Sequence, residues 1–118
     1  MNKLKEIIET ANLSEEGVFN NSKSKFVINS RNYSFSLFEK EDEIILEIKY
    51  KNRLMKDLQE LNAMKYAKIN AIVSIGGFSI DNRGQIKLEK LFSKHEETDN
   101  IVHAVIQFLQ NADHFVIL

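Results

Sequence analysis

Residues 26–50 read FVINSRNYSFSLFEKEDEIILEIKY, and this stretch decides the fold. Residues 26–28 favour a strand, residues 33–37 alternate aromatic or aliphatic side chains with serine, and residues 44–50 place isoleucine, leucine and tyrosine at every second position. Such an alternation is typical of strands that bury one face. The polar links between the three segments are too short for a parallel crossover, so we predict a three-stranded antiparallel meander.

The two faces of this sheet are predicted to differ in what covers them. The residues expected to pack against helices are Phe26, Ile28, Phe35, Leu37, Ile44, Leu46 and Ile48. The opposite face then carries four other apolar residues, Val27, Phe38, Ile45 and Ile72. An exposed apolar patch of about 300 Å² or more is typical of a partner or dimer surface. We interpret these four as candidate partner-binding residues, and the sequence leaves open that the first helix or the C-terminal tail covers them.

Helices are predicted both before and after the meander in the sequence. An N-terminal helix has one apolar stripe formed by Leu4, Ile7, Ile8 and Ala11. A second helix is expected over residues 52–66, and Asp99 is the expected N-cap of a third. The apolar stripe of that third helix consists of Ile101, Val102, Val105, Phe108 and Leu109. The mostly polar residues 12–25 are predicted to form a loop.

A second hairpin is predicted between the second and third helices. Apolar residues alternate over 69–75 and, after Gly76 and Gly77, again at Phe78 and Ile80. The sequence at 81–84 favours a turn, and Ile86 and Leu88 begin a return strand. The predicted order is therefore helix, three-stranded meander, helix, β-hairpin, helix. We interpret the chain as one α+β domain over residues 1–118.

Composition excludes several classes of function. The 118 residues include 16 Lys plus Arg against 17 Asp plus Glu, a net charge of -1, so no bulk electrostatic attraction to nucleic acid or to an anionic membrane is expected. Without cysteine there is no disulfide, thiol nucleophile or Cys-based zinc site. The sequence shows no secretory signal and no apolar run long enough to span a bilayer, which predicts a cytoplasmic protein.

The residues that often carry catalysis or bind metals form no motif in this chain. His95, His103 and His114 lack the spacing of helical zinc ligands. No Gly-x-Ser-x-Gly motif is present, and no Lys-Ser or Lys-Thr pair follows the glycines of residues 74–79 to make a phosphate loop. We therefore predict a non-enzymatic protein with no catalytic residue, metal site or cofactor.

The C-terminal tail ends in four consecutive apolar residues, Phe115, Val116, Ile117 and Leu118. Chain ends are usually polar and frayed, so this segment is expected to be covered. Its β-branched centre suits a strand, which can pair with an edge of its own sheet or with the same edge of a second copy. We favour the second arrangement and interpret the four residues as a homodimer interface.

The order of elements resembles the fold of class I type III secretion chaperones, which the bacterial YbjN-like domains share. The local likeness covers residues 58–91: a helix that ends in the Leu-Asn pair at 61–62, a strand that reaches the Asp-x-x-Gly turn at 81–84, and a return strand at 86–88. The resemblance implies a non-enzymatic homodimer that binds an extended segment of another protein. Effector chaperones are usually clearly acidic, and this chain, with a net charge of -1, is not.

Three hypotheses for the function follow. The leading one is a protein-binding module, chaperone-like or regulatory, that recognises an extended segment of a partner protein through the outer sheet face or a free sheet edge. The second is an immunity or inhibitor protein of a bacterial or phage system. The third is an enzyme acting on a small ligand, which would require a deep cleft holding a titratable residue of perturbed pKa.

Overall fold

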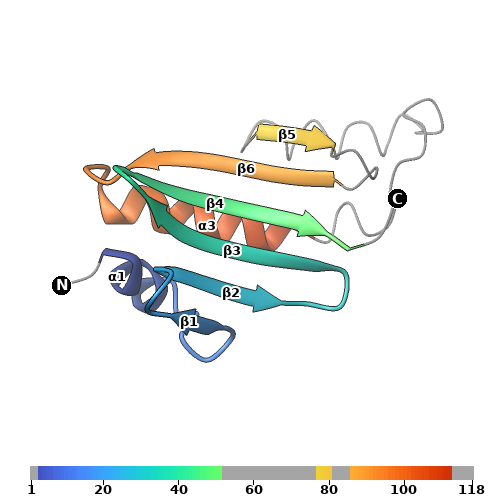
Figure 1. Ribbon diagram of the computed structural model, residues 1–118, viewed down its shortest axis with the longest axis horizontal. Helices are drawn as coiled ribbons and strands as arrows, with labels where there is room; N and C mark the ends of the chain where they lie inside the picture. Colours follow the sequence, from blue (N-terminus) through green and yellow to red (C-terminus); the bar gives the residue numbers. More distant parts are fainter. Residues whose placement is uncertain (1–2, 52–76, 81–85, 113–118) are drawn as a thin grey trace.

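The computed structural model describes residues 3–51, 77–80 and 86–112 of the chain (Figure 1). For residues 77–80 and for Ile86, only the backbone is described. In chain order the described elements are α1 (Lys3–Thr10), β1 (Val18–Asn20), β2 (Lys25–Asn29), β3 (Tyr33–Lys40), β4 (Glu43–Tyr50), β5 (Gly77–Ile80), β6 (Ile86–Ser93) and α3 (Thr98–Asn111).

The described strands form one antiparallel sheet in the order β1-β2-β3-β4-β6-β5. The predicted meander is confirmed as β2, β3 and β4, and the predicted second hairpin is confirmed as the antiparallel pair of β5 and β6. The pairing of β6 with β4 joins the meander and the hairpin into a single sheet. Among the described strands, β1 and β5 lie at its two edges.

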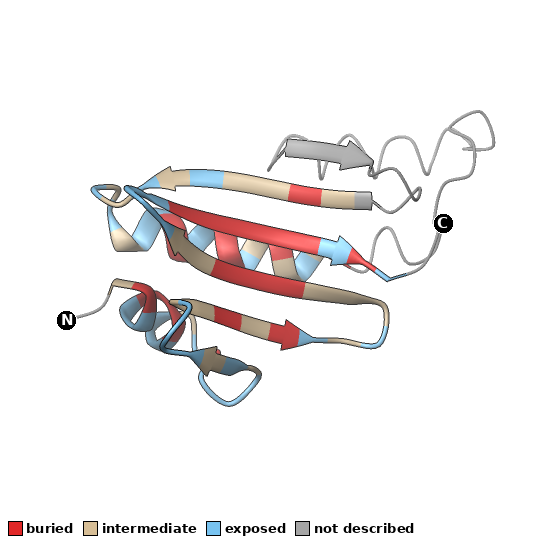
Figure 2. Cartoon of the chain, viewed as in Figure 1, coloured by how far each residue is buried: buried red, intermediate tan, exposed pale blue. Residues whose placement is uncertain are grey.

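One face of the sheet packs against both described helices and forms the core (Figure 2). All seven sheet residues predicted to face the helices are buried, and Tyr50 and Leu88 extend the same layer. From the helices, the core takes Leu4, Ile7 and Ile8 of α1 and Ile101, Val102, Ala104, Val105 and Phe108 of α3. The two helical stripes predicted from residue spacing therefore lie where period 3.6 requires, on the sheet side of each helix.

Three side-chain hydrogen bonds hold the two helices against neighbouring segments. The ammonium group of Lys3 donates to the carbonyl oxygen of Lys94 at 2.8 Å and to that of Glu96, which ties α1 to the loop before α3. At the other end of α3, the buried Tyr50 hydroxyl donates to the carbonyl oxygen of Ala112. Each bond supplies a donor to a backbone carbonyl that lies outside the hydrogen-bond ladders of the helices and the sheet.

The predicted loop over residues 12–25 contains the three-residue strand β1, so that prediction was wrong in part. Strand β1 pairs with β2 through Val18↔Val27, Phe19↔Phe26 and Asn20↔Lys25. Its exposure alternates, with Phe19 half-buried between two exposed neighbours. A single inward-facing side chain is too little for a periodic signal, which explains why the sequence pattern did not reveal this strand.

Two predicted boundaries also differ from the structure. Strand β3 continues to Lys40, and the turn after it is tightened by Glu41, whose φ is 56°. Helix α3 begins at Thr98, with Glu97 at the N-cap position and no side-chain capping bond, so Asp99 is not the cap. Asp99 lies in the first turn instead, where the positive end of the helix dipole stabilises its carboxylate.

Several predicted features lie outside the described residues. They are the helix over 52–66, the alternating segment at 69–75 with Ile72, the turn at 81–84, and the tail of Phe115, Val116, Ile117 and Leu118.

Candidate protein-binding surfaces

We call the sheet face opposite α1 and α3 the outer face; two adjacent rows of side chains cross the middle of it. One row consists of Lys25, Phe38, Ile45 and Leu91, which are successive partners across β2, β3, β4 and β6. The other row consists of Val18, Val27, Ser36, Glu47 and Glu89. Directly paired residues in antiparallel strands point to the same face, so each row is a line of neighbouring side chains.

The three described members of the predicted partner-binding set lie on this outer face. Val27 and Phe38 are half-buried, whereas Ile45 is only 7% exposed. Ile45 is covered because it sits between its direct partners Phe38 and Leu91. The most exposed apolar side chain of this row is Leu91, with 52% of its surface exposed, and Leu91 is not among the predicted partner-binding residues.

Charged side chains form a network beside these apolar residues. The ammonium group of Lys87 lies 3.3 Å from a carboxylate oxygen of Glu47 and 3.1 Å from one of Glu89, and Lys49 lies 3.5 Å from Glu47. The hydrogen bond to Glu89 raises the pKa of Lys87, partial burial opposes that shift, and Glu47 adds to it. Glu47, itself only 7% exposed, is thus buried with two cations beside it.

A second candidate surface is the free edge of the sheet at β1. In the described part of the chain β1 is an outermost strand, and Val18 at its start is 74% exposed. Edge strands present unpaired backbone N–H and C=O groups to which another chain can add. The turn that follows is held by the side-chain oxygen of Asn20, which accepts a bond from the hydroxyl of Ser22 at 2.7 Å and one from the backbone N–H of Lys23 at 3.3 Å.

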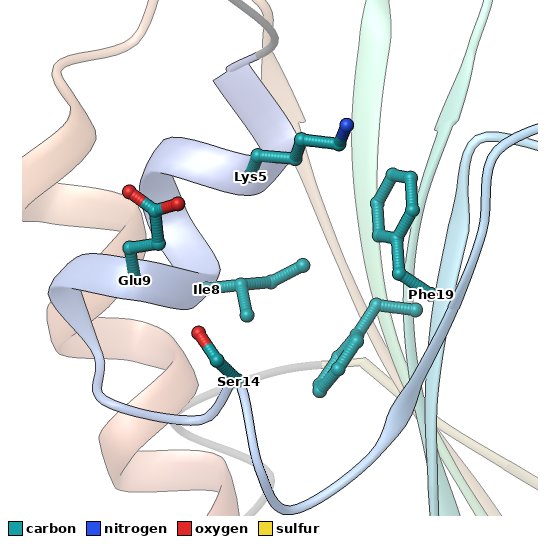
Figure 3. Close-up of a pocket in the computed structure, with 6 residues that line it drawn as sticks. Lys5, Ile8, Glu9, Ser14 and Phe19 are labelled. Atoms are coloured by element: carbon teal, nitrogen blue, oxygen red, sulfur yellow. The ribbon is translucent and has the colours of Figure 1, made fainter.

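A small pocket of about 130 Å³ opens between α1 and this edge (Figure 3). Its lining consists of Lys5, Ile8, Glu9, Ser14, Phe19 and Phe26. The ammonium group of Lys5 lies 5.4 Å from the ring centroid of Phe19, within range of a cation–π contact. Ile8 and the two phenylalanines make an apolar wall, while Lys5, Glu9 and Ser14 offer polar groups at the mouth.

No sequence signal pointed to this pocket. Phe19 falls in the predicted loop, and Lys5 and Glu9 occupy polar positions of the N-terminal helix. The three meet only because β1 adds to β2. The closest signal was the isolated pair Val18-Phe19 within a polar stretch, preceded by Gly17.

The groups that could support catalysis or metal binding are dispersed. His95 and His103 are both exposed, on the loop before α3 and on α3 itself, and His114 lies outside the described residues. Among the residues that the structure describes, no three His, Asp or Glu side chains are close enough to hold a metal ion. Neither described helix is long and apolar enough to cross a membrane.

The arrangement of helices and strands is similar to that of a chain in the HopA1-SchA chaperone–effector complex. The TM-score is 0.55, and the likeness covers 92% of this chain and 88% of that chain at 10% sequence identity. At this sequence identity the structural likeness shows the fold alone. It confirms the predicted α+β fold, which resembles that of a secretion chaperone. No protein-family model matches the sequence, and no curated protein matches it.

Proposed function

We propose that this protein is a non-enzymatic, chaperone-like binding module of the cytoplasm that binds an extended segment of another protein. The observation that carries the proposal is the β1 edge, which no other described strand covers, beside the apolar pocket between α1 and the sheet. The likeness of fold to a chain of a chaperone–effector complex supports it.

An extended segment that adds to β1 would gain backbone hydrogen bonds along the edge. Its side chains alternate in direction, so one set would lie over the pocket lined by Ile8, Phe19 and Phe26, and the other beside Val18. The backbone bonds provide sequence-independent affinity, and the pocket selects a small apolar side chain flanked by groups that suit Lys5 and Glu9.

The proposal also includes the outer face and a homodimer. Val27, Phe38 and Ile45 are proposed to add contacts to a partner chain, and the tail of Phe115, Val116, Ile117 and Leu118 is proposed to join two copies. Both are secondary to the β1 edge, because Ile45 is buried and the tail lies outside the described residues.

The test begins with affinity capture from an extract of the host cell, followed by proteolytic trimming of the captured protein to the bound segment. That segment is then titrated against the wild type and Val18→Glu. The substitution places a carboxylate on a side chain that is 74% exposed, so stability should change by no more than about 0.5 kcal/mol. Binding should weaken by about tenfold or more, because a charge now flanks the added strand.

Ile106→Glu is the matched control. Ile106 is an exposed apolar residue, 40% accessible, on α3 rather than on the sheet. The Ile106→Glu variant should bind the segment with the affinity of the wild type. Equal affinity of wild type and Val18→Glu, or an equal loss in Ile106→Glu, would contradict binding at the β1 edge.

A further inference from the structure

A hollow of about 380 Å³ lies on the outer face, at the end of the sheet where β3 turns into β4. Its lining residues are Lys40, Glu41, Glu43, Ile45, Glu89 and Leu91. Ile45 and Leu91 are direct partners across β4 and β6, and together they form an apolar floor. Leu91 keeps 52% of its surface exposed there, so the floor is accessible to a ligand.

The rim of this hollow is acidic. Its lining contains three carboxylates, those of Glu41, Glu43 and Glu89, and one ammonium group, that of Lys40. Glu89 is already paired with Lys87 at 3.1 Å, whereas no ion pair joins Glu41 or Glu43 to another described residue. The hollow therefore combines an apolar surface with unneutralised negative charge on one side.

We propose that this hollow binds a basic side chain, Lys or Arg, that stands between aliphatic residues in a partner polypeptide. Lys and Arg carry an apolar stem below a charged head, so the stem can cover Leu91 while the head reaches the carboxylates of Glu41 and Glu43. The neighbouring aliphatic residues would cover the rest of the floor. An acidic or purely polar segment satisfies neither requirement. This is a second surface, and it does not depend on binding at β1.

Another hollow on the same protein provides an internal control. It has about 310 Å³ and is lined by Asn12, Ser14, Glu15 and Glu16. It is therefore acidic and of similar size, but none of its described lining residues is apolar. If carboxylates alone were sufficient, a basic peptide would bind both hollows; the proposal requires binding only where Ile45 and Leu91 form the floor.

The experiment is a titration of the ¹⁵N-labelled full chain with the blocked peptide Ser-Leu-Arg-Leu-Ser, followed by amide chemical shifts. We expect saturable shifts at residues 41–45 and 89–91, and weaker binding at high salt because the rim charges are exposed. The double variant Glu41→Gln, Glu43→Gln should lower the affinity about fivefold, and Leu91→Ser about threefold. The variant pair Glu15→Gln, Glu16→Gln should leave it within about twofold.

Three results would overturn the proposal. The first is shifts that do not saturate or that lie elsewhere on the chain. The second is equal binding of the peptide with Glu in place of Arg, or of one with Ser in place of both Leu. The third is a concentration-dependent shift of the same amides without peptide, together with a dimer in sedimentation, which would identify a second copy of this chain as the occupant.

Discussion

Replacing Gly17 by alanine tests whether the strand β1 is held as closely to β2 as the structure has it. A Cβ atom on Gly17 would lie 2.4 Å from the carbonyl oxygen of Val27, 2.7 Å from Cζ of Phe26 and 2.9 Å from Cγ1 of Ile28. Ordinary contacts begin at 3.4 Å, so the backbone oxygen alone would have to move by 3.4 − 2.4 = 1.0 Å. Neither that oxygen nor the buried ring of Phe26 can move without disturbing β2.

We expect Gly17→Ala to reduce the free energy of unfolding by about 1–3 kcal/mol, the usual cost of forcing extra volume into a packed site. For a chain of this length that corresponds to a fall in the melting temperature of about 3–15 °C. The measurement is urea denaturation followed by circular dichroism, with a midpoint shift at constant slope. Hydrogen exchange should show the loss first at β1, since an edge strand can separate without global unfolding.

The matched control is Glu16→Ala, at the exposed position just before Gly17. Its stability should stay within about 0.5 kcal/mol of the wild type. If Gly17→Ala is as stable as this control, the close approach of Gly17 to β2 is refuted, and with it the position of the β1 edge used in the proposed function.

Two other predictions concern the ion network and the tail. Because the folded-state pKa of Lys87 is raised above 10.5, its ion pairs contribute stability that is fully present below pH 10.5 and is lost as the pH rises through the raised pKa. The difference in melting temperature between wild type and Lys87→Gln should therefore be constant from pH 7 to about 9 and should shrink above about 10.5; a constant difference up to pH 12 would count against the network. Deleting residues 115–118 should shift the light-scattering mass of a dimer towards that of a monomer, slightly below the 13.7 kDa of the full-length chain. A full-length chain that is already monomeric at high micromolar concentration would exclude the tail as a dimer interface.

The candidate sites were less predictable from the sequence than the fold was. Alternation placed Val27, Phe38 and Ile45 on the outer face correctly, because strand period is a local property. It did not give their exposure, since Ile45 is covered by Phe38 and by Leu91, and Leu91 lies 46 positions further along the chain (91 − 45). The acidic hollow follows from the same pairing of β4 with β6, which brings Leu91 beside Ile45 and makes Glu89 part of the same lining as Glu43.

The sequence by itself determined the meander, the inward layer from Phe26 to Ile48 and the apolar stripes of α1 and α3. Each of these follows from the spacing of apolar residues, every second residue in a strand and every third or fourth in a helix. The spacing is sufficient because burial of apolar surface is the main favourable contribution to folding. Only the tertiary structure decided that Val18–Asn20 is a strand, that β6 lies between β4 and β5, and which apolar residues stay open. Those features depend on which distant segments become neighbours, and a local period carries no information about the partner on the other side of a strand.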